Sequence, residues 1–279
     1  MKKFISLLLL FSITLVIFNG CETTTNNTPP ELPPYESMVI DFSKFNSGDK
    51  STDDVQDSTM LNYAAAGLTV FFWNAALTVT LVVPVAAFAQ SFNHQAEFLG
   101  DKTWQWTYDC NGLANTYTAR LVGVLRSDDI KWEMYLSKAG VAAHEEFLWF
   151  EGTSDLDGNG GQWILYHSFA LQEQVLQIDW EKTNDAVGLV KYTYVRESDN
   201  GDPNQLTAGS NLTYGLTDSV LDAFYSIDFN KRNRNADENQ SVEIEWSTTE
   251  YFGHIKALHY FQDENWHCWD SNGYDTDCE

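Results

Sequence analysis

Residues Ala64 to Gln90 read AAAGLTVFFWNAALTVTLVVPVAAFAQ, and none of them carries a charge. The run is long enough for a transmembrane helix, which needs ~20 mostly apolar residues. Two features favour a helix inside the protein instead. Small or polar residues at Gly67, Asn74 and Thr78 fall on one helical stripe, whereas lipid favours an apolar surface all round. Pro84 interrupts the hydrogen-bond ladder near the C-terminal end.

The flanks of the run give no signal for a membrane orientation. Aspartates dominate the N-terminal side, and Glu97, Asp101 and Lys102 follow on the other, so positive charge is concentrated on neither side. We therefore predict a buried helix over about residues 58–92. Two alternatives remain open, a helix that spans a membrane and a helix broken into a hairpin at Pro84.

The N-terminus has the layout of a secretory signal, with two lysines, an apolar run and a small residue before Cys21. The stretch FNGC, Phe18–Cys21, resembles the lipobox of bacterial lipoproteins, in which the cysteine is acylated and becomes the first residue of the mature chain. That motif usually has Leu where Phe18 stands. The resemblance implies a signal peptide over residues 1–20, lipidation at Cys21 and, since Glu22 is not Asp, an outer-membrane lipoprotein of the cell envelope. The alternative is ordinary secretion with an incidental thiol.

The segment after Cys21 is predicted to be a tether, and the rest a single domain. Residues 21–36 are rich in Thr, Asn and Pro and poor in apolar residues, so they cannot bury enough surface to fold. No second linker divides residues 37–279. The sequence therefore predicts one β-rich domain that carries the buried helix.

Acidic residues outnumber basic ones, 40 Asp and Glu against 16 Lys and Arg, for a formal charge of −24. Such a surface repels nucleic acid and anionic lipid headgroups. It attracts divalent cations and basic partners, although solubility alone also explains it. We expect no nucleic-acid partner.

Most of the chain after residue 103 alternates between apolar and polar residues, the pattern of half-buried strands. In SVEIEWST, 241–248, Val242, Ile244 and Trp246 share one face. Turn-forming residues at 127–129 and 157–160 predict two hairpins. With a further strand expected at Met38–Phe45, the fold class is mainly β with α: a curled antiparallel meander sheet of about ten strands wrapped on the long apolar helix.

Four stretches together carry a further resemblance. They are FNGC, 18–21; FFWNAALTVTLVVPVAAF, 71–88; IKWEMYLSK, 130–138; and the terminal WHCWD with its later DC, 266–278. In this combination the chain resembles a set of uncharacterised lipoproteins from Bacteroidota, which implies a location and no activity. The expected architecture also resembles the half-barrel lipoproteins of the outer membrane, in which a curled antiparallel sheet surrounds helix and holds lipid.

Three cysteines remain after Cys21. Cys268 and Cys278 lie in CWDSNGYDTDC, a short Gly-containing loop, so they form the least costly disulfide in an oxidising compartment. Three connectivities are possible in principle. The favoured one leaves Cys110 as a buried free thiol.

A weak calcium motif occurs at DLDGNGG, 155–161. Asp155, Asp157 and Asn159 stand at the first, third and fifth positions of a calcium loop. The twelfth position is Tyr166 where a bidentate Glu is expected, so the cage is incomplete. The alternative is a hairpin turn that uses Asp, Gly and Asn for their backbone freedom. Calcium is the only cofactor that the sequence suggests.

No catalytic constellation is present in the sequence. It has no nucleophile elbow or phosphate loop, and the six histidines are not spaced as metal ligands. We predict a non-enzymatic surface or periplasmic interaction module, in which the helix fills the sheet, the loops recognise a protein partner, and a lipid anchor contacts the membrane. The alternative is a carrier or binder of a hydrophobic or carbohydrate ligand within the curled sheet, and the sequence names no ligand-binding residue.

Overall fold

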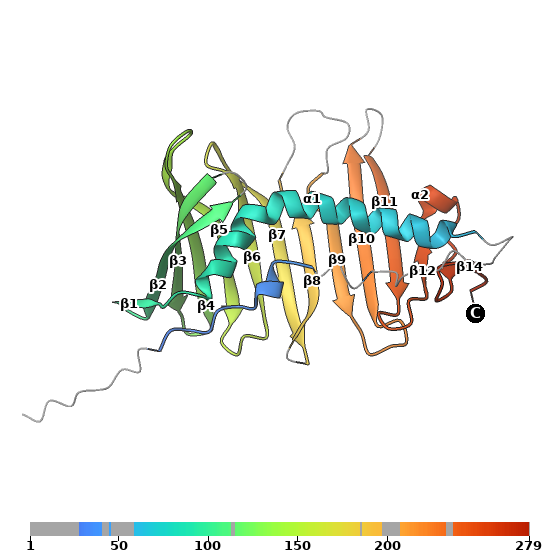
Figure 1. Ribbon diagram of the computed structural model, residues 1–279, viewed down its shortest axis with the longest axis horizontal. Coiled ribbons are helices and arrows are strands. Elements are labelled where there is room, and N and C mark those ends of the chain that lie inside the picture. Colours follow the sequence, from blue (N-terminus) through green and yellow to red (C-terminus); the bar gives the residue numbers. More distant parts are fainter. Residues whose placement is uncertain are drawn as a thin grey trace, which may run out of the picture.

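A computed structural model describes residues 28–40, 45, 59–112, 115–184, 186–196, 207–232 and 237–278. Within these ranges the chain forms one antiparallel sheet whose order is β1 through β14. Each strand pairs only with its neighbours in the sequence, and β1 and β14 form the two open edges. The predicted mainly β antiparallel meander is confirmed (Figure 1).

The strands have the following bounds: β1 (Glu97–Gly100), β2 (Thr103–Gly112), β3 (Asn115–Leu125), β4 (Asp129–Lys138), β5 (His144–Asp155), β6 (Gly160–Ser168), β7 (Leu171–Thr183), β8 (Ala186–Tyr194), β9 (Asn211–Leu216), β10 (Ala223–Arg232), β11 (Asp237–Trp246), β12 (Gly253–Lys256), β13 (His267–Trp269) and β14 (Asp275–Thr276). The helices are η1 (Tyr35–Ser37), α1 (Leu61–Ser91) and α2 (Leu258–Phe261).

The expected number of about ten strands is wrong, because the described residues form fourteen. The short strands β1, β13 and β14 have four, three and two residues, too few for a period-two pattern to show. The strand expected at Met38–Phe45 is also wrong over its described part. Residues 38–40 have no regular structure and pack against the sheet, where Met38 and Ile40 are buried.

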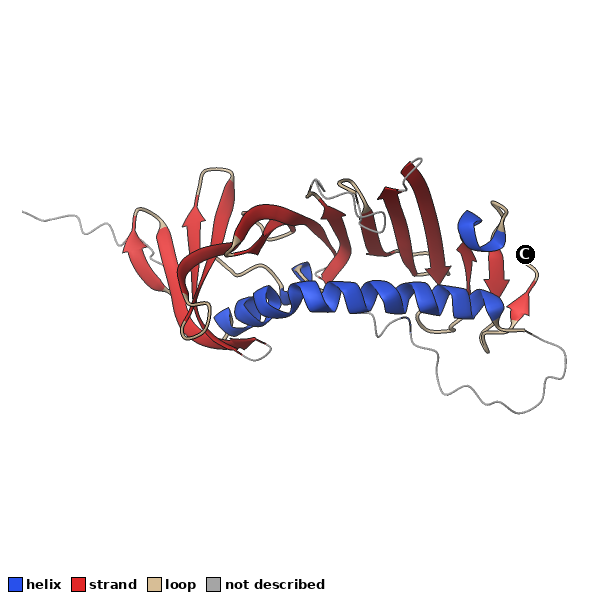
Figure 2. Ribbon diagram, turned by 90° about the horizontal axis from the view of Figure 1, so that it is seen from above, coloured by secondary structure: helices blue, strands red, loops and turns tan. Residues whose placement is uncertain are grey.

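Helix α1 crosses the strands on one face of the sheet (Figure 1). It contacts β12, β13 and β14 near its beginning and β2 and β3 near its end. Figure 2 shows it running along the sheet, which curls round the C-terminal half of the helix. The helix continues through Pro84, so the predicted hairpin alternative is wrong.

The core lies between α1 and the inner face of the sheet. Strand β4 shows the alternation, since Trp132 and Met134 are buried whereas Lys131 and Glu133 are on the other face. Segment 35–40 fills part of the same layer. There Trp163 donates to Ser37 Oγ at 3.1 Å and Tyr192 to the Met38 carbonyl at 2.9 Å.

Tryptophan and glycine alternate across neighbouring strands where the sheet curls. Gly123 on β3 pairs with Trp132 on β4, and Gly152 on β5 lies between Trp132 and Trp163. A Cβ at Gly152 would lie 2.4 Å from Trp163 Cε3 and 2.2 Å from the Gln162 carbonyl oxygen. Each glycine therefore leaves the room that a neighbouring indole occupies, which lets large rings stack on a strongly curved sheet.

The predicted burial of the whole helix is wrong. The face that carries Ala66, Val70, Trp73 and Leu77 is buried, but the opposite face of the N-terminal half is open. The reason is geometric, because a helix on one face of an open sheet contacts a layer on only one of its sides.

Candidate interaction site

Four large apolar residues form an exposed strip on the outer face of α1. Leu61, Leu68, Phe71 and Phe72 are each between 57% and 70% exposed. Leu61, Leu68 and Phe72 are spaced seven and four residues apart and Phe71 follows Leu68 by three, which places all four on one side of the helix. No residue of α1 is charged. We call these four residues the apolar strip, and contiguous patches of this kind mark interaction sites.

An apolar groove continues beside the second half of the helix. The groove has a volume of about 320 Å³ and is lined mainly by the helix, segment 35–40 and β8. Its apolar lining includes Leu77, Leu81, Val85 and Val39, and Tyr192 contributes from the sheet. The Tyr192 pKa is raised because its hydroxyl is buried, which keeps this side of the groove uncharged.

A loop from the opposite end of the chain holds the beginning of α1. Asp275 on β14 accepts hydrogen bonds from the backbone N–H of Leu61 at 3.2 Å and of Asn62 at 2.9 Å, and from the Thr59 hydroxyl. The helix has no N-cap side chain of its own, so Asp275 supplies both the acceptor and the negative charge that a helix N-terminus favours.

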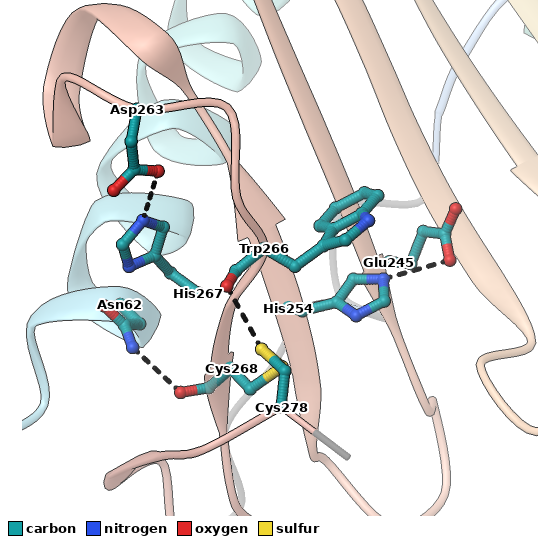
Figure 3. The surroundings of a disulfide bond; sticks show 8 residues. All are labelled: Asn62, Glu245, His254, Asp263, Trp266, His267, Cys268 and Cys278. Atoms are coloured by element: carbon teal, nitrogen blue, oxygen red, sulfur yellow. Dashed lines mark hydrogen bonds and ion pairs between the residues drawn. A yellow bond between two sulfur atoms is a disulfide. The ribbon is translucent and has the colours of Figure 1, made fainter.

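The same loop is closed by a disulfide between Cys268 and Cys278 (Figure 3). This is the pair that the sequence favours. Asn62 of α1 donates its side-chain amide to the Cys268 carbonyl at 2.8 Å. The disulfide therefore joins β13, whose Cys268 carbonyl accepts from Asn62, to the residues just after β14, which carries Asp275.

The end of α1 is held by apolar packing. Phe88 is fully buried and meets Phe150 and Trp163 edge-on, with ring centroids 6.1 and 5.3 Å away. Tyr108 donates its hydroxyl to the Ala87 carbonyl at 2.7 Å. Burial raises the Tyr108 pKa, so this hydroxyl stays a donor over the whole physiological range.

Charged groups gather on the face of the sheet that points away from α1. There Lys131 lies 2.7 Å from Glu133 and 3.6 Å from Glu151, measured from Nζ to carboxylate oxygens. Arg120 pairs with Glu146, which lowers the pKa of that carboxyl through a hydrogen bond from the guanidinium. The apolar strip and these ion pairs therefore belong to different faces of the molecule.

The free thiol falls where the sequence predicts it. Cys110 on β2 is buried and unpaired, and burial raises the pKa of its thiol to about 11, with the Asp109 carboxylate adding to the rise. The thiolate is the reactive form, so this cysteine is expected to be inert in the folded protein. The predicted lipidation site Cys21 and the signal over residues 1–20 lie outside the described residues.

The weak calcium motif forms the turn between β5 and β6. Asp157 accepts from the backbone N–H of Asn159 at 3.1 Å and from its side-chain amide at 2.9 Å, and the Gly158 N–H donates to the Asp155 carbonyl at 3.0 Å. Over the described ranges, no three His, Cys, Asp or Glu side chains are grouped so as to hold a metal. The calcium prediction therefore gains no support and plays no further part.

The groups that sequence reasoning missed are the apolar strip and Asp275. The strip gives no distinct signal, because apolar residues cover most of α1 and the stripe of Gly67, Asn74 and Thr78 does not show which apolar side the sheet covers. A signal for the cap was available in the absence of Ser, Thr, Asp or Asn at residue 60, which is Met.

Comparison of the chain with protein-family models, curated proteins and solved structures found no match. Across the described ranges, no helix combines the length and the hydropathy that crossing a membrane requires.

Proposed function

We propose that this chain is a non-catalytic interaction module of the cell envelope, tethered to the outer membrane through Cys21, and that it docks a partner protein on the apolar strip. One observation carries the proposal: a charge-free helix fills the inner face of the sheet and leaves Leu61, Leu68, Phe71 and Phe72 open to solvent. This exposure adds no stability to the monomer. A partner that covers the strip removes apolar surface from water and so stabilises the complex.

The size of the strip suits a protein contact. An aromatic side chain buries 150–250 Å² when it is fully covered, so four large side chains at these exposures offer on the order of 400 Å². Patches of roughly 300–600 Å² on monomers are often functional. Aromatic residues are also enriched at the centre of protein interfaces, where charged residues are depleted.

A protein fits the strip better than a bilayer surface does. Helices that lie in a membrane interface carry Lys or Arg on their polar face, and α1 has neither. The chain carries a formal charge of −24, which opposes anionic headgroups. The lipid on Cys21, inferred from the FNGC sequence, supplies the membrane contact instead.

Site-specific photo-crosslinking in intact cells tests this proposal. A photoreactive amino acid is placed at Phe71, and a matched one at Tyr260 on α2, which is 50% exposed but lies off the strip. We expect a discrete protein adduct from position 71 alone, and the purified partner to lose binding at least tenfold to the Phe71→Ser variant. Adducts with lipid only, or binding of the purified chain to zwitterionic vesicles that Phe71→Ser abolishes, would overturn protein docking.

The membrane tether has its own test. Cys21→Ser is expected to move the protein from the membrane fraction to the soluble one after a high-pH wash. If that variant still fractionates with membranes, the lipidation proposal is wrong, whatever the crosslinks show.

The groove supports a second function, the binding of one apolar ligand. An enclosed apolar cavity of about 150 Å³ already binds benzene, and the groove offers about 320 Å³. The ligand would lie beside α1, because the helix occupies the inner face of the sheet. Native mass spectrometry of purified protein tests this by the mass of any bound lipid. Val85→Trp should displace the ligand, whereas Phe71→Ser should leave it bound.

A further inference from the structure

Three hairpin turns meet at one end of the sheet, away from α1. In a meander every second turn lies at the same end, so the β7–β8, β9–β10 and β11–β12 turns are neighbours (Figure 1, lower edge). A pocket of about 590 Å³ lies among them, and its described lining residues are all different from those of the groove. Clusters of loops on a rigid sheet are common places for binding sites.

The pocket is held in shape by a hydrogen-bonded fork between two of the turns. Asp222, before β10, accepts from the backbone N–H and from the hydroxyl of Thr248, both at 2.7 Å. The Asp222 carbonyl in turn accepts from the Thr217 N–H at 2.8 Å, which closes the β9–β10 turn. Ligand binding therefore costs less loop entropy here than it would at a flexible site, because the turns are already ordered.

Tyr251 lines the pocket with a strained backbone. Its φ is +65°, a region that bulky side chains rarely adopt. The strain is held by two contacts, since its N–H donates to the Ser247 carbonyl at 3.0 Å and its carbonyl accepts from Trp269 Nε1 at 2.9 Å. Its side chain is nevertheless 38% exposed, so burial does not explain why a tyrosine stands there. Strained residues of this kind gather at functional sites.

The lining selects a class of ligand. It offers the hydroxyl of Thr183, the amide of Asn184 and the carboxylates of Asp218 and Asp222, whereas the Thr217 hydroxyl donates to the Leu221 carbonyl within its own turn. Among the described residues that line the pocket, none is Lys, Arg or His. Two carboxylates without a cation disfavour an anionic ligand, whereas they accept readily from hydroxyl groups. An aromatic ring beside such acceptors matches a molecule with one apolar face and a rim of hydroxyls.

We propose that this pocket binds a neutral carbohydrate of one or two sugar units, with Tyr251 stacking on a sugar ring and Asp218 and Asp222 accepting from its hydroxyls. The volume lies in the range of roughly 300–1,000 Å³ that small-molecule sites occupy. This site lies on the loops and is separate from the docking strip, so either proposal can fail without the other.

A defined panel of sugars tests the proposal on the purified chain. The probes are disaccharides of glucose, mannose, galactose and N-acetylglucosamine, a sialylated and a sulfated oligosaccharide, and spermidine, each titrated by calorimetry. We expect binding of at least one neutral disaccharide and none of the anionic ones. Absence of binding by every neutral disaccharide up to 10 mM, which is ~100-fold above a Kd of about 0.1 mM, or binding of spermidine alone, would overturn it.

The backbone strain at Tyr251 gives a variant that separates binding from folding. Tyr251→Gly relieves the positive φ and removes the ring, so the melting temperature should stay or rise while sugar affinity falls at least tenfold. Tyr251→Phe should keep most of the affinity, and Tyr260→Ala, at a similarly exposed tyrosine outside the pocket, should keep all of it. If Tyr251→Gly binds sugar as the parent does, the assigned platform is wrong.

Discussion

The two halves of α1 have the same apolar character and opposite surroundings. The half from Leu61 to Ala75 lies where the sheet is more open and exposes the apolar strip, whereas the half from Leu81 to Ser91 lies where the sheet curls. Ala87, Phe88 and Ser91 are fully buried. The first half is held at its tip by Asp275 and its loop, and the second by packing against aromatic rings.

This contrast shows that hydropathy indicates which residues are favoured to leave water, whereas the shape of the sheet decides which of them become buried. Both halves lack charge and both are helical, yet the half inside the curve is more fully buried: Phe88 is 0% exposed there, whereas Phe71 in the first half is 70% exposed. A partner that covers the exposed half would therefore stabilise the complex by about 25 cal/mol for each Å² of apolar surface removed from water.

The largest effect is expected where the helix is surrounded. Phe88→Ala removes a fully buried ring that contacts Phe150 and Trp163, and should lower the free energy of unfolding by about 3–5 kcal/mol. Phe72→Ala on the strip should change it by no more than about 0.5 kcal/mol. Urea denaturation of both variants measures the difference, and equal losses would remove the contrast between the halves.

The next effect concerns the loop that holds the exposed half. Replacing Cys268 and Cys278 by Ser should cost about 2–3 kcal/mol, because the open loop gains freedom in the unfolded chain. Hydrogen exchange should also rise in the first turns of α1, through Asn62, while amides around Phe88 keep their protection. Uniform exchange along the helix would show that the loop does not act on one end.

Asp275 is expected to contribute less than the disulfide. Asp275→Ala removes the acceptor for the Leu61 and Asn62 N–H groups and should cost about 1 kcal/mol. Asp275→Asn keeps one acceptor oxygen and should recover roughly half of that loss, since the charge also interacts with the helix dipole. Thermal unfolding of the pair separates hydrogen bonding from charge, and an unchanged Asp275→Ala protein would exclude the cap.

The smallest effect is a gain. Gly67 lies in the exposed half, and a Cβ there would meet Phe45 Cε1 at 3.7 Å, an ordinary contact. Gly67→Ala should therefore stabilise the protein by about 0.5–1 kcal/mol through helix propensity. In the surrounded half, Ala87→Val should destabilise it by about 1–3 kcal/mol, because no room is left. Melting temperatures that move in the same direction would contradict the comparison.

The alternation of side chains predicts most of the sheet, because each long strand must bury one face. Strand β11 shows this, with Val242, Ile244 and Trp246 all buried as expected. Where the pattern fails, the elements are short or their ends are tied by distant groups. Strand β14 has two residues and exists because the disulfide and the first turn of α1 hold it.

The candidate sites were less accessible to sequence reasoning than the fold. A helix that is apolar over most of its surface does not reveal which face the sheet covers, so the apolar strip follows only from the placement of α1. Asp275 and Asn62 are 213 residues apart, and nothing local links them. The turns around Tyr251 likewise come together only because the strands of a meander alternate in direction.

The open ends of the sheet have a consequence for how the protein survives at high concentration. Unpaired strand edges template association between chains, and they do so best when they are long and flat. Here the two edges are β1, with four residues that begin at Glu97 and end at Gly100, and β14, with two residues beside the Cys268–Cys278 bridge. Strand β1 pairs only with residues 103–105 of β2, so residues 106–112 continue this edge with no strand partner on that side among the described residues. A second sheet would therefore add to β2 beyond the end of β1.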